Sequence, residues 1–121
     1  RFFDNDVMTA MQKPVFEALR TDNARKDEAM TEAARALDLA YGWLERRLEG
    51  RTWAAGETKS LADCAAAPSL FYADWVHPIA HTFPQLRAYR SRLLAWPSFA
   101  RAVDEARPYR HYFPLGAPDR D

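Results

Sequence analysis

The feature that most constrains this 121-residue chain is a polar helix start followed by a long apolar segment. Ser60 and Asp63 have the spacing of a capping box. In that motif the Ser60 hydroxyl accepts from the Asp63 N–H, and the Asp63 carboxylate accepts from the Ser60 N–H. The other residues of 61–67 are apolar, so we expect a helix over residues 60–75 that other elements surround. An enclosed helix cannot leave its first N–H groups to water, and the motif therefore predicts the central helix of a bundle.

The rest of the chain also follows the helical period. Apolar residues recur every three or four positions in residues 3–19 and 30–48, which predicts two helices packed as an antiparallel pair. We expect a polar loop at residues 21–27, with Asp27 capping the second helix and Gly50 ending it. Two further helices are expected over residues 84–96 and 98–106, and the Pro-rich segment from residue 107 should be ordered only by packing. We therefore expect one all-α domain over residues 1–121, a bundle of about five helices.

The charge balance argues against two classes of partner. Seventeen basic and seventeen acidic residues cancel, which argues against nucleic-acid binding and against a basic membrane-surface helix. No apolar run approaches the roughly 20 residues needed to span a bilayer. The basic cluster of Arg87, Arg90, Arg92 and Arg101 is expected to be a solvated helix face. The single cysteine, Cys64, excludes an internal disulfide and fits a reducing, cytoplasmic location.

A longer motif contains the capping box. Residues 48–63 read LEGRTWAAGETKSLAD, which is a helix end, a tryptophan turn, a glycine and then Ser-Leu-Ala-Asp. This run resembles the central signature of the glutathione transferase C-terminal domain. The resemblance covers essentially the whole chain, and the tail at residues 107–114 is similar to that of bacterial members. Downstream residues that match the family in order and spacing are Pro84, Leu86, Arg92, Leu93, Trp96, Pro97, Ser98 and Phe99.

The resemblance implies a function for the whole parent protein. Glutathione transferases join a thioredoxin-like N-terminal domain, which supplies the thiol-activating Ser, Tyr or Cys, to a helical domain. The chain opens on Arg1 rather than Met, so we expect that domain to precede it and assign no catalytic residue here. The parent is expected to be a homodimer that conjugates glutathione to hydrophobic electrophiles or reduces them with it. The alternative is a non-catalytic assembly domain of the same fold.

The resemblance also implies a wall for the electrophilic co-substrate, formed by the first helix and the tail. Flexible Met side chains suit a broad apolar pocket, and ordinary core packing is the alternative for these residues. The expected wall residues are Phe3, Val7, Met8, Met11, Tyr112 and Phe113.

Three polar residues of the first helix are candidates for binding glutathione. In some bacterial relatives a His-Lys pair on this helix approaches glutathione, and the matching position here is Gln12-Lys13. The Lys13 ammonium could pair with a glutathione carboxylate while Gln12 hydrogen-bonds the peptide. Asn5 could reach the amino group of the partner subunit's glutathione. The alternative for Gln12 and Lys13 is a solvated helix surface.

Two further features are interpreted as structural. Cys64 falls early in the capped helix, where a thiol pKa can be lowered, but its small apolar neighbours favour a buried cysteine acting as a small hydrophobe. His77 and His81 are four residues apart, the spacing of two metal ligands on a helix. Pro78 intervenes and no third ligand lies at a useful spacing, so we expect no metal site.

Overall fold

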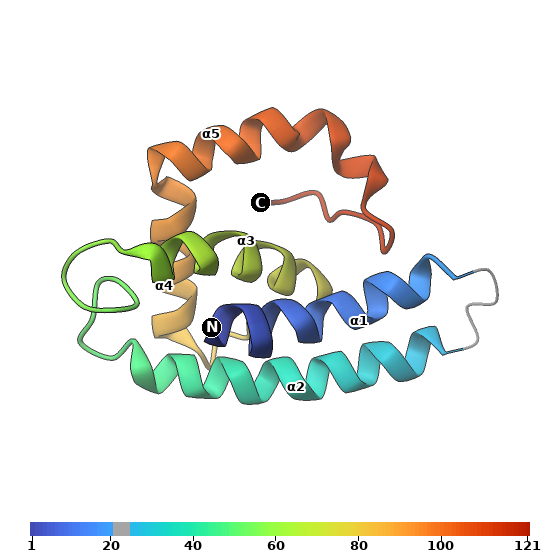
Figure 1. Ribbon diagram of the computed structural model, residues 1–121, viewed down its shortest axis with the longest axis horizontal. Helices are drawn as coiled ribbons and strands as arrows, with labels where there is room; N and C mark the ends of the chain where they lie inside the picture. Colours follow the sequence, from blue (N-terminus) through green and yellow to red (C-terminus); the bar gives the residue numbers. More distant parts are fainter. Residues whose placement is uncertain (21–24) are drawn as a thin grey trace.

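The computed structural model describes residues 1–20 and 25–121, and these form a helical bundle (Figure 1). Within the described residues the only strand-like pairing is an isolated bridge between Trp53 and Gly56. The expected all-α bundle of about five helices is confirmed. No helix in these residues is long and apolar enough to cross a membrane. In chain order the elements are the π-helical segment η1 (Phe3–Met8), α1 (Thr9–Ala18), α2 (Lys26–Arg47), α3 (Leu61–Val76), α4 (Pro84–Ala95), α5 (Pro97–Ala106) and the 3-10 helix η2 (Arg107–Tyr112).

The first two helices form the expected antiparallel pair. η1 and α1 are one continuous helical run that lies beside α2 (Figure 1). Val7 and Met11 from the first run pack in the same buried cluster as Leu37 and Tyr41 of α2. These residues recur at the helical period, so each helix presents one apolar stripe to the other.

The connection between these helices differs from the expectation. The expected loop covered residues 21–27, of which 21–24 lie outside the described residues, and α2 already includes Asp27. The prediction that Asp27 caps α2 is wrong, because Arg25 holds the N-cap position and makes no side-chain cap hydrogen bond. Asp27 lies in the first turn of α2, where the helix dipole favours its negative charge. Gly50 follows α2 with a φ of 70°, a left-handed conformation that favours glycine after a helix.

Helix α3 lies at the centre of the bundle and packs against η1 and α4. Ala66, Leu70 and Ala73 along it are completely buried. Its first turn is different, because Leu61 is 86% exposed and Cys64 is also exposed. The expectation that the helix is surrounded on all sides is therefore wrong for this turn, and so is the expectation of a buried Cys64. η1 and α4 occupy the other sides of the helix and leave this one to solvent.

The Asp63 carboxylate joins three segments at the start of α3. Its Oδ2 accepts from the Ser60 N–H at 2.8 Å, and the Ser60 hydroxyl accepts from the Ala62 N–H at 3.3 Å. The expected capping box is thus confirmed. Oδ1 also accepts from the Ala54 N–H at 3.0 Å and from the Tyr89 hydroxyl of α4 at 2.6 Å. Burial and the bond to Asp63 raise the pKa of Tyr89, so that hydroxyl remains a donor.

The basic cluster on α4 and α5 is only partly a solvated face. Arg101 is exposed and pairs with Glu105 on its own helix. The side chain of Arg90 is only 12% exposed, so the expectation of a solvated residue is wrong there. Its guanidinium donates to the backbone carbonyls of Leu70 and Phe71 in α3, at 3.3 Å each. A buried charge needs such acceptors, and the Leu70 and Phe71 carbonyls supply them in addition to the ion pair with Asp74.

Replacing Asp63 should destabilise the fold strongly. Asp63→Ala removes the acceptor of three donors, namely the part-buried Ser60 and Ala54 N–H groups and the buried Tyr89 hydroxyl. We expect the free energy of unfolding to fall by about 3–5 kcal/mol, as for other broken buried charge networks. Asp63→Asn should be intermediate because only one oxygen remains to accept. Urea denaturation checks this, with Tyr89→Phe as a control that removes one donor and should cost about 1 kcal/mol. Wild-type stability in Asp63→Ala would contradict this account.

Candidate functional site

An apolar cavity of about 460 Å³ lies between α1, α3 and the segment that follows α5. Its volume falls within the range of small-molecule sites. The segment from residue 107 to residue 121, called the tail below, forms one side of it. In Figure 1 the tail follows α5 and turns back over the bundle toward its middle. The residues that line the cavity are Met8, Met11, Gln12, Val15, Phe71, Tyr72, Trp75, Val103, Ala106, Tyr109, Arg110, Tyr112, Phe113 and Pro114.

Aromatic rings from α3 and the tail meet at this cavity. Phe113 is stacked on Tyr72 with ring centroids 5.7 Å apart, and it meets Trp75 edge-on at 5.3 Å. The Trp75 indole nitrogen is buried and has no acceptor among the described residues. The rings give the cavity flat apolar walls, whereas the indole nitrogen has almost no accessible surface.

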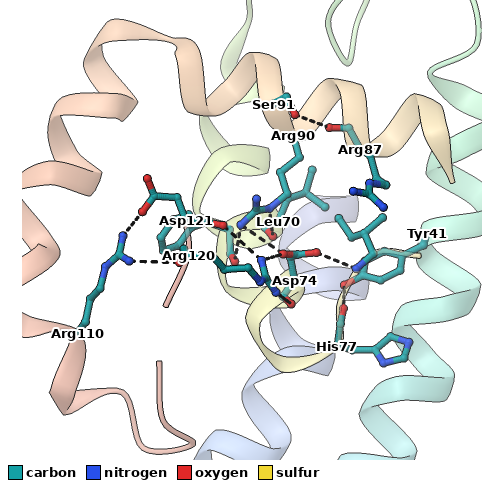
Figure 2. Close-up of polar contacts among 12 residues, drawn as sticks. Tyr41, Leu70, Asp74, His77, Arg87, Arg90, Ser91, Arg110, Arg120 and Asp121 are labelled. Atoms are coloured by element: carbon teal, nitrogen blue, oxygen red, sulfur yellow. Dashed lines mark hydrogen bonds and ion pairs between the residues drawn. The ribbon is translucent and has the colours of Figure 1, made fainter. Parts of the chain in front are cut away.

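Ion pairs fold the end of the tail back onto its start, and one further ion pair attaches it to α3 (Figure 2). Arg107 donates two hydrogen bonds to the Asp121 carboxylate, at 2.9 and 2.7 Å, and Arg110 donates a further one. Arg120 binds the Asp74 carboxylate at the end of α3. The Arg110 guanidinium also lies over the Trp75 ring, 5.3 Å from its centroid. Hydrogen bonds from Arg107 and Arg110 lower the pKa of Asp121 to about 2, which shows how these cations favour its charged form.

The six expected wall residues divide into two groups. Met8, Met11, Tyr112 and Phe113 line the apolar cavity, two from the first helical run and two from the tail. Phe3 and Val7 are buried in the core instead. Met8, Met11, Gln12 and Val15 follow the helical spacing of one face, and that face is turned toward the cavity.

The expected glutathione-binding residues do not form one cluster. Gln12 lines the apolar cavity, whereas Asn5 and Lys13 line a separate hollow of about 380 Å³ between η1, α1 and α2. Successive residues of a helix are about 100° apart, so Gln12 and Lys13 face different surfaces. The Lys13 ammonium lies 3.7 Å from Glu32 of α2, and both side chains are more than half exposed.

The aromatic side of α3 was missed from the sequence. Phe71, Tyr72 and Trp75 line the cavity. The sequence predicts only that they belong to an apolar helix, and does not indicate that they line a pocket. Their spacing carried a signal, because Phe71 and Trp75 are four residues apart and therefore share a helix face. That face meets Phe113, which lies 38 residues further along the chain from Trp75.

The remaining candidate side chains lie elsewhere. Cys64 is exposed on the first turn of α3 and does not line the cavity. His77 hydrogen-bonds Asp38 through Nε2 at 2.7 Å. Among residues 1–20 and 25–121 no group of three or more His, Cys, Asp or Glu side chains is placed to hold a metal ion.

Weakening the ion pairs of Asp121 should loosen the tail, because they join its last residue to Arg107 and Arg110 near its start. Asp121→Asn removes the charge that Arg107 and Arg110 bind, so we expect faster limited trypsin cleavage after Arg110. The melting temperature should change little, because the buried core lies outside this contact. Wild-type protein should become more susceptible to cleavage in the tail by pepsin, which is active in acid, as the pH falls from about 4 toward 2, relative to the Asp121→Asn variant at each pH. The pKa of Asp121 is lowered in the folded state, so its stabilisation is present above the ordinary carboxyl pKa and lost below it.

Trypsin cleavage of the wild-type protein near neutral pH is the reference rate for Asp121→Asn. Asp119→Asn is a matched control, because Asp119 is exposed and its side chain makes no contact in the described structure. Equal cleavage rates for Asp121→Asn, Asp119→Asn and wild type would show that these ion pairs do not hold the tail.

Comparison with known proteins gives one family. The chain matches the family model described as glutathione S-transferase, C-terminal domain, over residues 6–97. Searches of curated proteins and of solved structures found no significant match. The matched region includes α1 to α4 and ends before most of α5 and the tail.

Proposed function

Because the chain belongs to the glutathione S-transferase C-terminal domain family, we propose that it is the helical domain of a glutathione transferase and binds the electrophilic co-substrate. The apolar cavity between α1, α3 and the tail is the observation that carries this proposal. Glutathione would be the second substrate, and the reaction would be its conjugation to the electrophile or a reduction of that electrophile. Detoxification in the cytoplasm is the role that fits such a reaction.

The lining favours a flat aromatic electrophile. Phe71, Tyr72, Trp75 and Phe113 offer ring faces and edges, and Met8 supplies an adaptable side chain opposite them.

The domain would act by positioning rather than by proton transfer. The nucleophile in such a reaction is a thiolate, and activating it requires a group that lowers the thiol pKa. We assign no catalytic residue in this chain. Its contribution is to hold the electrophile in a fixed orientation, away from water, while Gln12 offers the cavity an amide that could hydrogen-bond glutathione. Asn5 and Lys13 remain proposed glutathione contacts from a separate surface.

The alternative, a non-catalytic assembly domain, gains no support from the cavity. An assembly domain needs an exposed contact surface but no apolar pocket of this size. The cavity here is bounded by a tail that Arg120 attaches to Asp74 of α3, which suits a small ligand better than a macromolecular partner.

Binding of an aromatic electrophile tests the proposal. Titration with 1-chloro-2,4-dinitrobenzene should quench tryptophan fluorescence saturably, because Trp75 lines the cavity. Phe113→Ala should weaken binding by about tenfold, the effect of losing one aromatic contact of about 1.5 kcal/mol. Phe16→Ala is the matched control, since Phe16 is 61% exposed and lies outside the cavity. Equal affinities for the two variants, or unsaturable quenching, would refute the proposed site.

We also propose that the parent is a homodimer, with a contact face on α2. Leu39 is 75% exposed, and Trp43, one turn away, stacks on Phe2 at 4.3 Å while remaining partly exposed. Exposed apolar groups this close together are typical of protein contact surfaces.

Leu39→Glu should therefore weaken self-association. In sedimentation velocity, the wild-type protein should show concentration-dependent dimers, and Leu39→Glu should remove them because a charge would be buried at the contact. Leu61→Glu is a control at an equally exposed apolar position on α3. Dimers that persist in Leu39→Glu but disappear in Leu61→Glu would place the contact on the wrong face.

A further inference from the structure

A second, polar pocket lies on the other side of the tail. It has a volume of about 320 Å³ and shares no lining residue with the apolar cavity. α4, the end of α3 and the tail contribute its walls. Figure 2 shows Arg87 and Arg90 extending from α4 toward the region of Asp74 and Arg120. The residues that line this polar pocket are Asp74, Pro78, Ile79, Arg87, Arg90, Ser91 and Arg120.

The polar pocket carries an excess of positive charge. Three guanidinium groups, those of Arg87, Arg90 and Arg120, share it with one carboxylate, that of Asp74. Asp74 already accepts from the Ile79 N–H at 2.7 Å and pairs with both Arg90 and Arg120. Among the lining residues, one carboxylate therefore offsets only one of three positive charges. The Asp121 carboxylate is not part of the lining and is already bound by Arg107 and Arg110. Burial lowers the pKa of Arg90, Asp74 raises it and Arg120 lowers it, while Tyr41 and Asp121 raise it by smaller amounts.

Much of the donor capacity in this pocket is unused. Arg90 commits Nε and Nη2 to the backbone of α3, but its Nη1 makes no hydrogen bond within the described residues. The Arg87 guanidinium makes no hydrogen bond or ion pair with any described residue. Arg87 and Arg90 are three residues apart and therefore lie on the same face of α4, so their free donors can reach one ligand.

From this arrangement we propose that the polar pocket binds a phosphate group, as inorganic phosphate or as a phosphomonoester, through Arg87 and Arg90. Planar guanidinium forks match the oxygens of a phosphate, and hydrogen bonds between two charged groups are the strong ones. A dianion would neutralise the two charges that Asp74 leaves unbalanced. The polar pocket is distinct from the apolar cavity, so this inference does not rest on the proposed transferase function.

Phosphate should also act on the tail. Arg120 docks beside Arg90, and the repulsion between these two cations opposes docking. An anion in the polar pocket would reduce that repulsion. Because the tail lines the apolar cavity, phosphate in the polar pocket would help to keep that cavity closed.

The test is a titration of the 121-residue protein with inorganic phosphate at constant ionic strength, set with sodium chloride. We expect a saturable rise in melting temperature, because a ligand that binds the folded state stabilises it. Arg87→Gln should weaken the apparent affinity by about tenfold, the loss expected for one charged hydrogen-bonding partner. Arg35→Gln is the matched control, since Arg35 is exposed on α2 and makes no side-chain contact with a described residue.

Two further measurements identify the ligand and test its effect on the tail. Glycerol phosphate binding as tightly as inorganic phosphate would indicate a phosphomonoester site, and weaker binding would indicate free phosphate. Phosphate should slow trypsin cleavage after Arg110 in wild type and not in Arg87→Gln. The proposal is overturned if phosphate and chloride have equal effects, if succinate binds as well as phosphate, or if Arg87→Gln behaves like Arg35→Gln.

Discussion

The structure depends on one buried carboxylate at the start of its central helix. Asp63 accepts hydrogen bonds from the first turn of α3, from the turn that precedes it, and from α4. Three segments that are apart in sequence thereby share one acceptor group, and its burial makes each bond costly to break. The cap fixes where α3 begins. It thus fixes where the aromatic side chains of that helix lie, two to three turns further on.

A second buried carboxylate has the corresponding role near the other end of α3. Asp74 accepts from the Ile79 N–H and pairs with Arg90 of α4 and Arg120 of the tail. The two carboxylates together hold α3, α4 and the tail in a fixed arrangement. The apolar cavity exists only in that arrangement, because α3 and the tail each supply part of its lining. The shape of the apolar cavity therefore depends on ion pairs as well as on apolar packing.

Local signals predicted the parts of this structure that local interactions determine. The capping box was predictable because its partners are three residues apart, and Met8 and Met11 were predictable from the helical period. The bond from Tyr89 to Asp63 spans 26 residues, and no local pattern indicates it. The predictions that Cys64 is buried and that Arg90 is exposed were wrong for the same reason. Their exposure depends on which faces of α3 and α4 meet, and that is decided by tertiary packing.

The central claim, that small aromatic molecules bind between α1, α3 and the tail, is tested most directly through the methionine methyl groups. The chain has three methionines, of which Met8 and Met11 line the apolar cavity and Met30 does not. In a titration with 1-chloro-2,4-dinitrobenzene followed by NMR of ¹³C-methyl-labelled methionine, ring currents should shift the signals of Met8 and Met11 saturably with one affinity. The Met30 signal should stay in place. Equal shifts at all three methyl groups, or a shift at Met30 alone, would contradict the account.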